Sequence, residues 1–369
     1  MYGLLDVSIS HRLFSSIKWE GKEYQCTLVL GSSLLQLLKL EKVMRSIDVL
    51  LDGDSMHPGK RAKITTQNSS NKKMNVYIWD MDETLILLKS LLNGTYAEGF
   101  NGSKDVQKGI YIGKMWEKHI LQICDDYFFY EQIENYNKPL LDSLSEYDDG
   151  KDLSDYDFSK DGVSSPHDDL NKKKLAYRHR IIGHKYEQGL RNVIDQDTMK
   201  QLDDLYELTD SYTDRWLSSA RAFLEQSSEG KNSTPHLAAA NRVTESSDSK
   251  SDKVNILVTA GSLIPSLVKC FLFRLDDLIM HQNVYSSWDV GKPKCFSWIK
   301  DRFNGPNVQF CVIGDGWEEC EAAQIMKWPL VQIDHRPSGF HRFPGLTLKT
   351  VGYYISVIYE PSNSESDEK

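Results

Sequence analysis

Two aspartates separated by one residue form the most informative segment of the chain. This segment, IWDMDETLI at positions 78–86, places Asp80 and Asp82 directly after an apolar run and before an apolar helical pattern. Thr259 and Asp315 end two further apolar runs of the same kind. Ligands bind outside the carboxyl ends of the strands of an open parallel sheet, so all four side chains are expected at one rim.

This group of side chains suits Mg²⁺-dependent phosphoryl transfer. Carboxylate oxygens of Asp80 and Asp315, with water and the main-chain carbonyl of Asp82, match the octahedral oxygen coordination that Mg²⁺ prefers. A carboxylate repels a phosphate dianion, and a Mg²⁺ ion that bridges the two reduces this repulsion. We assign Asp80 as the nucleophile, which forms an aspartyl-phosphate. Asp82 is assigned as the acid and base that protonates the leaving oxygen and then activates water.

Further residues complete the predicted site. The hydroxyl of Thr259 can donate to a phosphate oxygen, and Lys292 supplies positive charge for the transition state. Thr84 is a second candidate for binding the substrate. Glu319 lies one helical turn after Asp315 and is expected to hold Lys292 or a metal-bound water. Each feature alone is commoner in turns, surfaces and sheets, but their occurrence together in this order favours catalysis.

Other catalytic classes lack their motifs. No cysteine has an arginine six residues downstream, as the thiolate cradle of cysteine phosphatases requires. The chain contains no Gly-x-x-x-x-Gly-Lys-Ser/Thr loop and no His-Glu-x-x-His motif for zinc. Its six cysteines are scattered without a Cys-x-x-Cys pair, so we expect reduced thiols rather than a metal or redox centre.

The composition of the 369-residue chain is that of an average soluble protein, with 40% hydrophobic residues, which is enough for a sizeable core. Its 44 basic and 53 acidic side chains give a net charge of −9, which argues against direct binding of nucleic acid. No apolar run is long enough to span a membrane, and the first residues do not resemble a secretory signal. We therefore expect an intracellular protein of the cytoplasm, the nucleus or both, without a membrane partner.

Four short apolar runs predict strands buried on both faces of a parallel sheet: 75–79, 254–259, 308–314 and 330–333. Between the first and the second, apolar side chains at helical spacing predict an all-helical module. One helical stripe runs from Ile112 to Tyr127 and another from Leu202 to Trp216. The predicted fold class is α/β, a parallel sheet flanked by helices, with an all-helical bundle inserted after the first strand.

These patterns divide the chain into four parts. The expected parts are a partly disordered N-terminal extension at 1–73, an α/β phosphatase core at 74–93 and 252–345, a helical insert at 94–251 with acidic and Ser-rich loops, and a C-terminal segment with a disordered tail at 346–369. Met74 immediately precedes the first core strand, so a chain begun there would keep every catalytic motif.

The motifs resemble the haloacid dehalogenase superfamily of aspartate-based phosphatases, and more closely the Eyes absent family in its plant branch. The matching blocks are WDMDET at 79–84, LLNGTYA at 91–97, NVYS at 283–286, GK at 291–292 and IGDGWEE at 313–319. The resemblance implies a haloacid dehalogenase-like Rossmannoid sheet and a Mg²⁺-dependent phosphatase that acts on phosphotyrosine in protein substrates. The preference for tyrosine rests on the resemblance alone.

At matching positions the resemblance also carries over the roles of single residues. These are the nucleophile Asp80, the acid and base Asp82, the phosphate-binding Thr259 and Lys292, and the metal ligands Asp80, Asp82 and Asp315, with Glu319 in support. Animal members of the family carry a long region rich in Pro, Ser, Thr and Tyr before the catalytic domain. Residues 1–73 are short and contain one proline, Pro58, so a coactivator role does not carry over directly.

Two alternatives remain open. A phosphoserine phosphatase of the small C-terminal-domain type also begins Asp-x-Asp-Glu-Thr, although the large insert and the GDGWEE block at 314–319 count against it. A non-catalytic module would instead bind protein partners or co-regulate transcription through the helical insert or the C-terminal region. Because every motif residue is present, this second alternative ranks lower.

Overall fold

The computed structural model describes residues 73–157, 169–228 and 252–360, and the backbone of three short strands before residue 27. The chain forms two compact units, Met1–Gly53 and Asp54–Lys369. The first contains an antiparallel sheet in the order β1-β2-β3. Its strands are β1 Val7–Ser8, β2 Ser15–Trp19 and β3 Lys22–Cys26. Most of the predicted N-terminal extension, the Ser-rich loop and the C-terminal tail lie outside the described residues.

The second unit contains a five-stranded, all-parallel sheet in the order β6-β5-β4-β7-β8. Its strands are β4 Met74–Trp79, β5 Asp252–Thr259, β6 Val284–Ser286, β7 Val308–Gly314 and β8 Leu330–Gln332. In the central strand, Trp79 pairs with Leu257 on one side and with Ile313 on the other. The four predicted strands are confirmed. β6 is an additional strand, too short to stand out as an apolar run.

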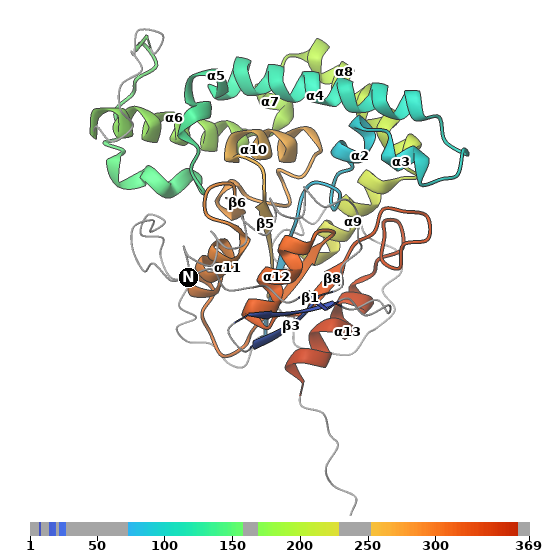
Figure 1. Cartoon of the computed structure of the whole chain (residues 1–369). Coiled ribbons are helices and arrows are strands. Elements are labelled where there is room, and N and C mark those ends of the chain that lie inside the picture. The colour runs from blue at the N-terminus through green and yellow to red at the C-terminus, as the bar shows by residue number, and fades with distance from the viewer. Residues whose placement is uncertain are drawn as a thin grey trace, which may run out of the picture. The chain divides into compact units, whose positions relative to one another are not determined.

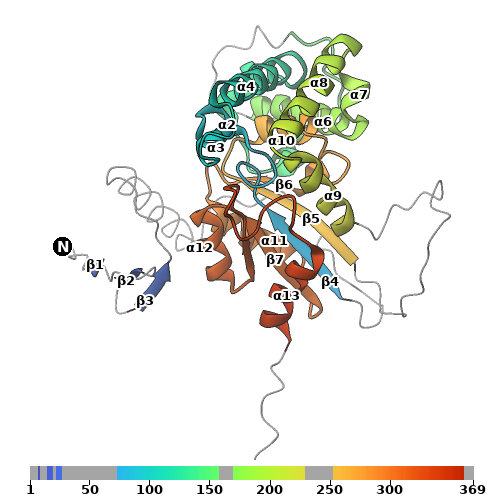
Figure 2. The ribbon, with the colours of Figure 1, turned by 90° about the vertical axis from the view of Figure 1, so that its right-hand side faces the viewer.

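Helices cover both faces of this sheet. They are α9 Trp216–Ser228, α11 Lys292–Arg302, α12 Trp317–Met326 and α13 Leu348–Tyr359. Alternate residues of β4 face opposite ways, so Ile78 packs with Phe296 of α11, whereas Trp79 meets the ring of Phe223 of α9 edge-on. Figure 2 shows β4 and β5 side by side, with α9 next to them. This arrangement confirms the predicted α/β fold of the haloacid dehalogenase type.

Every described element between β4 and β5 is helical. The elements before α9 are α2 Leu88–Leu92, α3 Thr95–Glu98, α4 Val106–Phe128, α5 Tyr130–Ile133, η1 Glu134–Tyr136, η2 Leu141–Tyr147, α6 Asp169–Gln188, α7 Leu190–Val193 and α8 Gln196–Tyr212. Figure 1 shows α4, α6, α7 and α8 gathered in a layer beyond one end of the sheet. The stripe from Ile112 to Tyr127 lies on α4, as predicted.

The stripe from Leu202 to Trp216 spans two helices rather than one. α8 ends at Tyr212, and Asp214 and Arg215 then adopt the left-handed conformation, with φ of 56° and 67°. Residues in this conformation end a right-handed helix because they turn the chain away from its axis. The new helix, α9, leaves the helical layer and packs against β5.

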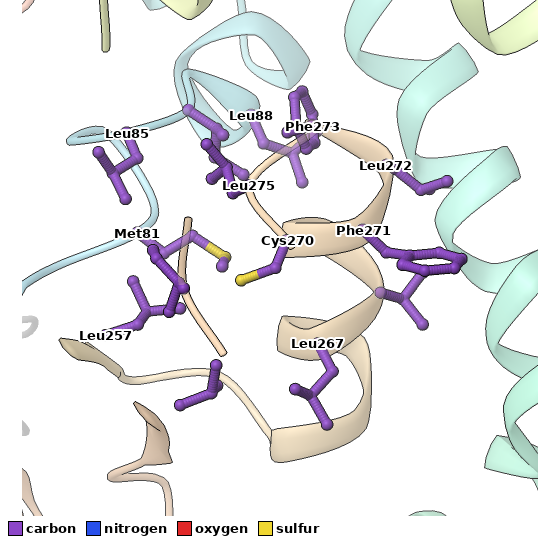
Figure 3. Packing of buried hydrophobic residues seen from close by; sticks show 14 of the residues in the cluster. Met81, Leu85, Leu88, Leu257, Leu267, Cys270, Phe271, Leu272, Phe273 and Leu275 are labelled. Carbon is purple, nitrogen blue, oxygen red and sulfur yellow. The ribbon is translucent and has the colours of Figure 1, made fainter. Parts of the chain in front are cut away.

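α10, Leu263–Leu272, joins the sheet to the helical layer. It follows β5, as the sequence predicts, and its Phe271 meets Phe128 of α4 edge-on, with ring centroids 5.7 Å apart. Figure 3 shows Cys270 of α10 pointing toward Met81, which lies in the loop after β4. The remaining short helix, η4 His281–Asn283, precedes β6. Across the described residues, no helix combines the length and apolar character that a membrane span needs.

Candidate active site

A tight loop at the carboxyl end of β4 positions the two aspartates. Asp80 extends the sheet, since its amide donates to the carbonyl of Ile313 at 2.9 Å. The carbonyl of Met81 then accepts from the amide of Thr84 at 3.3 Å, and Glu83 takes a positive φ of 65° inside this turn. The turn brings Thr84 back toward the strand end, where its Oγ1 lies 3.5 Å from Asp80 Oδ2.

Asp80, Lys292 and Glu319 form a buried ion triad. Lys292 Nζ donates to Asp80 Oδ1 at 2.6 Å and also pairs with Glu319 Oε1. The three side chains are 8%, 3% and 4% exposed, respectively. Burial raises the pKa of Asp80, and the ammonium of Lys292 acts in the opposite direction. The pairing of Glu319 with Lys292 that the sequence suggests is therefore present.

The two glycines around Asp315 make room for this triad. A methyl group on Gly314 would lie 2.6 Å from Glu319 Cγ and 3.2 Å from Asp80 Cβ. A methyl group on Gly316 would lie 2.5 Å from Glu319 Oε2. The ion triad therefore requires glycine, with no side chain, on both sides of Asp315, in addition to any role of these glycines in the turn.

Asp315 lies close to Asp80 at the end of β7. Thr84 Oγ1 is 3.4 Å from Asp315 Oδ1 and 3.5 Å from Asp80 Oδ2, so its one proton can be donated to either carboxylate. Burial, followed by the charges of Asp80 and Glu83, raises the pKa of Asp315 to about 7. Carboxylates from β4 and β7 therefore meet at one rim, as the strand-end argument requires.

Glu83 contributes a further buried carboxylate. Its Oε1 accepts from the amide of Ser90 at 3.0 Å. Its Oε2 makes no hydrogen bond within the described part of the chain, and His335 Nδ1 lies 3.9 Å from it. Burial raises the pKa of Glu83. Around Lys292, negative side chains consequently outnumber positive ones among the described residues.

Asp82 faces a cation that the sequence motifs did not indicate. Lys269 Nζ, from α10, donates to Asp82 Oδ1 at 2.7 Å and to Oδ2 at 2.8 Å. The Asp82 carboxylate is 34% exposed, which makes it more accessible than that of Asp80. This carboxylate is thus directed to α10, away from the ion triad.

Thr259 ends β5 at the position expected for a phosphate-binding hydroxyl. Its Oγ1 accepts from the amide of Gly261 at 3.2 Å, and its carbonyl accepts from the amide of Ser287 at 2.8 Å. The loops after β5 and β6 are therefore bonded to each other. The structure joins five of the seven predicted side chains in one bonded group: Asp80, Thr84, Lys292, Asp315 and Glu319.

The donor set fits a hard cation that binds oxygen, such as Mg²⁺. The residues that could hold it are Asp80 and Asp315 through their carboxylates and Asp82 through its main-chain carbonyl. The unbonded Oε2 of Glu83 and the raised pKa of Asp315 mark an excess of buried negative charge that a divalent cation would offset. No three Asp, Glu, His or Cys side chains within the described ranges form a ready-made cage. Mg²⁺ commonly uses one or two carboxylates and keeps several waters.

Sequence reasoning missed two residues at this site, of which only Lys269 carries a signal in the sequence. Lys269 is the one charged residue in the helix LIPSLVKCFL, and a lysine on an otherwise apolar helix needs a partner. Glu83 stands inside the Asp80–Thr84 motif, but its burial depends on a positive φ that a single sequence does not reveal.

Comparisons with known proteins place the chain among phosphatases. No family model matches. Protein phosphatase EYA of Arabidopsis thaliana is 61% identical over 307 residues, which cover 83% of this chain and 98% of that protein. Protein phosphatase EYA2 of Homo sapiens is 32% identical, over 76% of this chain. Protein phosphatase eya of Drosophila melanogaster is 30% identical, over 75% of this chain. The match spans 51% of the human relative and 36% of the fly relative.

Proposed function

The chain belongs to the Eyes absent family of protein phosphatases, and we propose that it is a Mg²⁺-dependent protein tyrosine phosphatase with Asp80 as its nucleophile. The observation that carries the proposal is the buried contact of 2.6 Å between Asp80 Oδ1 and Lys292 Nζ at the end of the central strand. An ammonium at this position favours the ionised, nucleophilic carboxylate and can later face the phosphoryl oxygens.

In the first proposed step, a carboxylate oxygen of Asp80 attacks the phosphorus of a phosphotyrosine side chain. The bond between phosphorus and the tyrosyl oxygen breaks, and the carboxyl of Asp82 gives its proton to that oxygen. In the second step, the Asp82 carboxylate takes a proton from water, and the water oxygen attacks the phosphorus of the aspartyl-phosphate. The bond between phosphorus and the Asp80 oxygen breaks, inorganic phosphate leaves, and Asp80 and Asp82 return to the carboxylate and the protonated carboxyl, respectively.

The other residues of the site bind and orient the phosphoryl group. Lys292 and Thr259 would contact its oxygens, with Thr84 as a further donor at the strand end. Glu319 holds the Lys292 ammonium in place by their buried ion pair. Mg²⁺, held by Asp80, Asp315 and the carbonyl of Asp82, would supply the charge neutralisation that lets a carboxylate approach a phosphate dianion.

Turnover of a phosphotyrosine peptide tests the proposal directly. We expect turnover to stop with EDTA and to return with added Mg²⁺. Asp80→Asn should lower turnover by roughly 10³ or more, with the fold retained because Lys292 keeps Glu319 as a partner. Asp301→Asn, on the exposed side of α11, is the matched control and should leave turnover unchanged. Full turnover by Asp80→Asn would reject the assigned nucleophile.

Sequence-matched phosphotyrosine and phosphoserine peptides separate the proposal from the first alternative. A faster reaction of the phosphoserine peptide would favour a phosphatase of the small C-terminal-domain type. The second alternative, a non-catalytic module, predicts no Mg²⁺-dependent turnover by the unaltered chain. The preference for tyrosine rests on the resemblance of the motifs to the Eyes absent family, and this peptide pair is its decisive test.

A further inference from the structure

A short segment of the helical insert reaches into the α/β core at the ends of β5 and β6. Residues 137–140 connect η1 to η2. Leu140 is buried in the apolar cluster that also contains Tyr285 of β6. The carbonyl of Pro139 accepts from the amide of Ser286 at 2.9 Å. These contacts anchor the segment and fix the position of Asn137.

Asn137 bonds the loops that follow two neighbouring strands. Its Oδ1 accepts from the amide of Leu263, after β5, at 2.8 Å. Its Nδ2 donates to Asp289 Oδ2, after β6, at 2.7 Å, and lies 3.4 Å from Ser286 Oγ. A backbone amide only donates and a carboxylate only accepts, so this orientation of the side-chain amide satisfies both partners.

Asn137 supplies the cap that α10 lacks locally. Ser262 occupies the N-cap position, but its side chain makes no capping hydrogen bond. The first amide of the helix, that of Leu263, is bonded instead by a side chain 126 residues earlier in the chain. Because the first amides of a helix have no partner within it, such a cap holds the start of the helix in place.

Each of the two loops bonded by Asn137 adjoins a residue assigned to phosphate binding. The loop after β5 follows Thr259, the last residue of that strand, and the loop after β6 leads to Lys292, the first residue of α11. Ser286 Oγ donates to the carbonyl of Gly261 at 2.7 Å, and Ser287 Oγ donates to the carbonyl of Thr259 at 3.0 Å. A shift of either loop would therefore move the other, and with them the groups that face the phosphate.

We propose that Asn137 is a positioning residue of the phosphatase site. Through Leu263 and Asp289 it sets the spacing of the two loops that adjoin Thr259 and Lys292, and so couples the helical insert to phosphate binding. This inference rests on the proposed function, because it concerns how that site holds its phosphoryl group. It assigns the insert a role in the affinity of the site for phosphate.

The first test is Asn137→Ala in the full chain. The KM for a phosphotyrosine peptide and the inhibition constant of inorganic phosphate should both rise about tenfold, the effect of losing a hydrogen bond to a charged group. The turnover number should change less, because Asp80 and Asp82 are untouched. Asn192→Ala is the matched control: its Nδ2 donates to the carbonyl of Gln188 within the insert, and it should change neither constant.

A charge swap gives a sharper test. Asn137→Asp still accepts from Leu263 but places a carboxylate against that of Asp289, so phosphate affinity should fall at least as far as in Asn137→Ala. Asp289→Asn keeps an oxygen for Asn137 to donate to, so its effect should be smaller. Asn137→Asp combined with Asp289→Asn restores a donor and an acceptor and should recover most of the affinity.

Hydrogen exchange measures the same contact without any reaction. The amide of Leu263 should exchange faster in Asn137→Ala, whereas the amides of β7 should keep their rate. An unchanged inhibition constant in both single variants of Asn137, or a double variant no better than Asn137→Asp, would overturn the inference. If the unaltered chain showed no Mg²⁺-dependent turnover, the proposed function would fail, and exchange at Leu263 would still report on the contact itself.

Discussion

Lys269 donates to both carboxylate oxygens of Asp82, at 2.7 and 2.8 Å, from a helix that is otherwise uncharged. The Lys269 side chain is 15% exposed, so most of this α10 side chain is buried. The same helix is capped by Asn137 of the insert. α10 therefore contacts the proposed acid and base, Asp82, through Lys269, and it contacts the helical insert through Asn137 at its first residue.

Lys269→Met should slow the proposed reaction while the fold is retained, since methionine keeps the apolar stem and removes the charge. We expect turnover to fall roughly 10-fold to 100-fold, the range for one hydrogen bond to a charged group. The contact with an ammonium supports Asp82 as the base of the second step rather than as the acid of the first. The loss should therefore be larger for 4-nitrophenyl phosphate, whose good leaving group makes the second step limiting, than for phenyl phosphate. Lys185→Met, which removes a contact to the Tyr127 carbonyl in the insert, is the control. Equal losses on both substrates would argue against an effect through Asp82.

Lys292→Met should affect stability and catalysis together. It leaves the carboxylates of Asp80 and Glu319 buried without a cation, which lowers the free energy of unfolding by about 3–5 kcal/mol. Turnover should fall by roughly 10² to 10³ through loss of a transition-state charge. Denaturant titration and steady-state kinetics measure the two effects. Lys294→Met, two residues along α11, should leave both near the values of the unaltered chain; a loss of the same size there would show that the helix, not the triad, is responsible.

The metal-free protein should become less stable as pH rises toward neutrality. Asp315 has a pKa of about 7 in the folded state, against an ordinary value of 3.8 for this carboxyl, so the folded state binds the proton more tightly. This stabilisation is complete below about pH 4 and is lost as pH rises through about 7. Thermal midpoints measured in EDTA from pH 4 to 8 should therefore fall more steeply for the unaltered chain than for Asp315→Asn. Parallel curves would contradict the raised pKa.

Mg²⁺ affinity should show the opposite trend with pH. A carboxylate must lose its proton before it can bind a cation, so the affinity should increase as pH rises through about 7. Calorimetric titration with Mg²⁺ at pH 6 and pH 8 measures this. Asp315→Asn should bind weakly at both values, and tight, pH-independent binding by this variant would remove Asp315 as a ligand.

The sheet and the five bonded site residues follow from local sequence signals. A strand buried on both faces is apolar over most of its length, and the strands ending at Trp79, Thr259 and Gly314 are so in the halves that approach these ends. Parallel strands bring their carboxyl ends to one edge, which is why residues as distant as Asp80 and Asp315 could be placed together. The residue types in the motifs indicated the reaction, and the parallel order of the strands indicated that these residues lie close together.

The contacts of Asn137 and Lys269 could not be predicted in this way. The Asn137 contact depends on how the insert docks on the core, and the Lys269 contact depends on how α10 packs beside the loop after β4. No periodicity in the sequence specifies a partner 126 or 187 residues away. β6 has only three residues, and its place in the sheet is set by pairing with β5. Contacts that form only when distant segments pack together therefore cannot be predicted from local sequence patterns.

Gly316→Ala should damage the site through Glu319 alone. The added methyl group would lie 2.5 Å from Glu319 Oε2, so the carboxylate must move and its ion pair with Lys292 must weaken. Overpacking of this kind costs about 1–3 kcal/mol of stability, and turnover should fall with it. Gly352→Ala is the control, because its methyl group meets nothing within 4 Å in the middle of α13 and should stabilise the helix by about 0.5–1 kcal/mol. If Gly316→Ala kept full turnover and stability, the Glu319 carboxylate would not need the space that this glycine leaves.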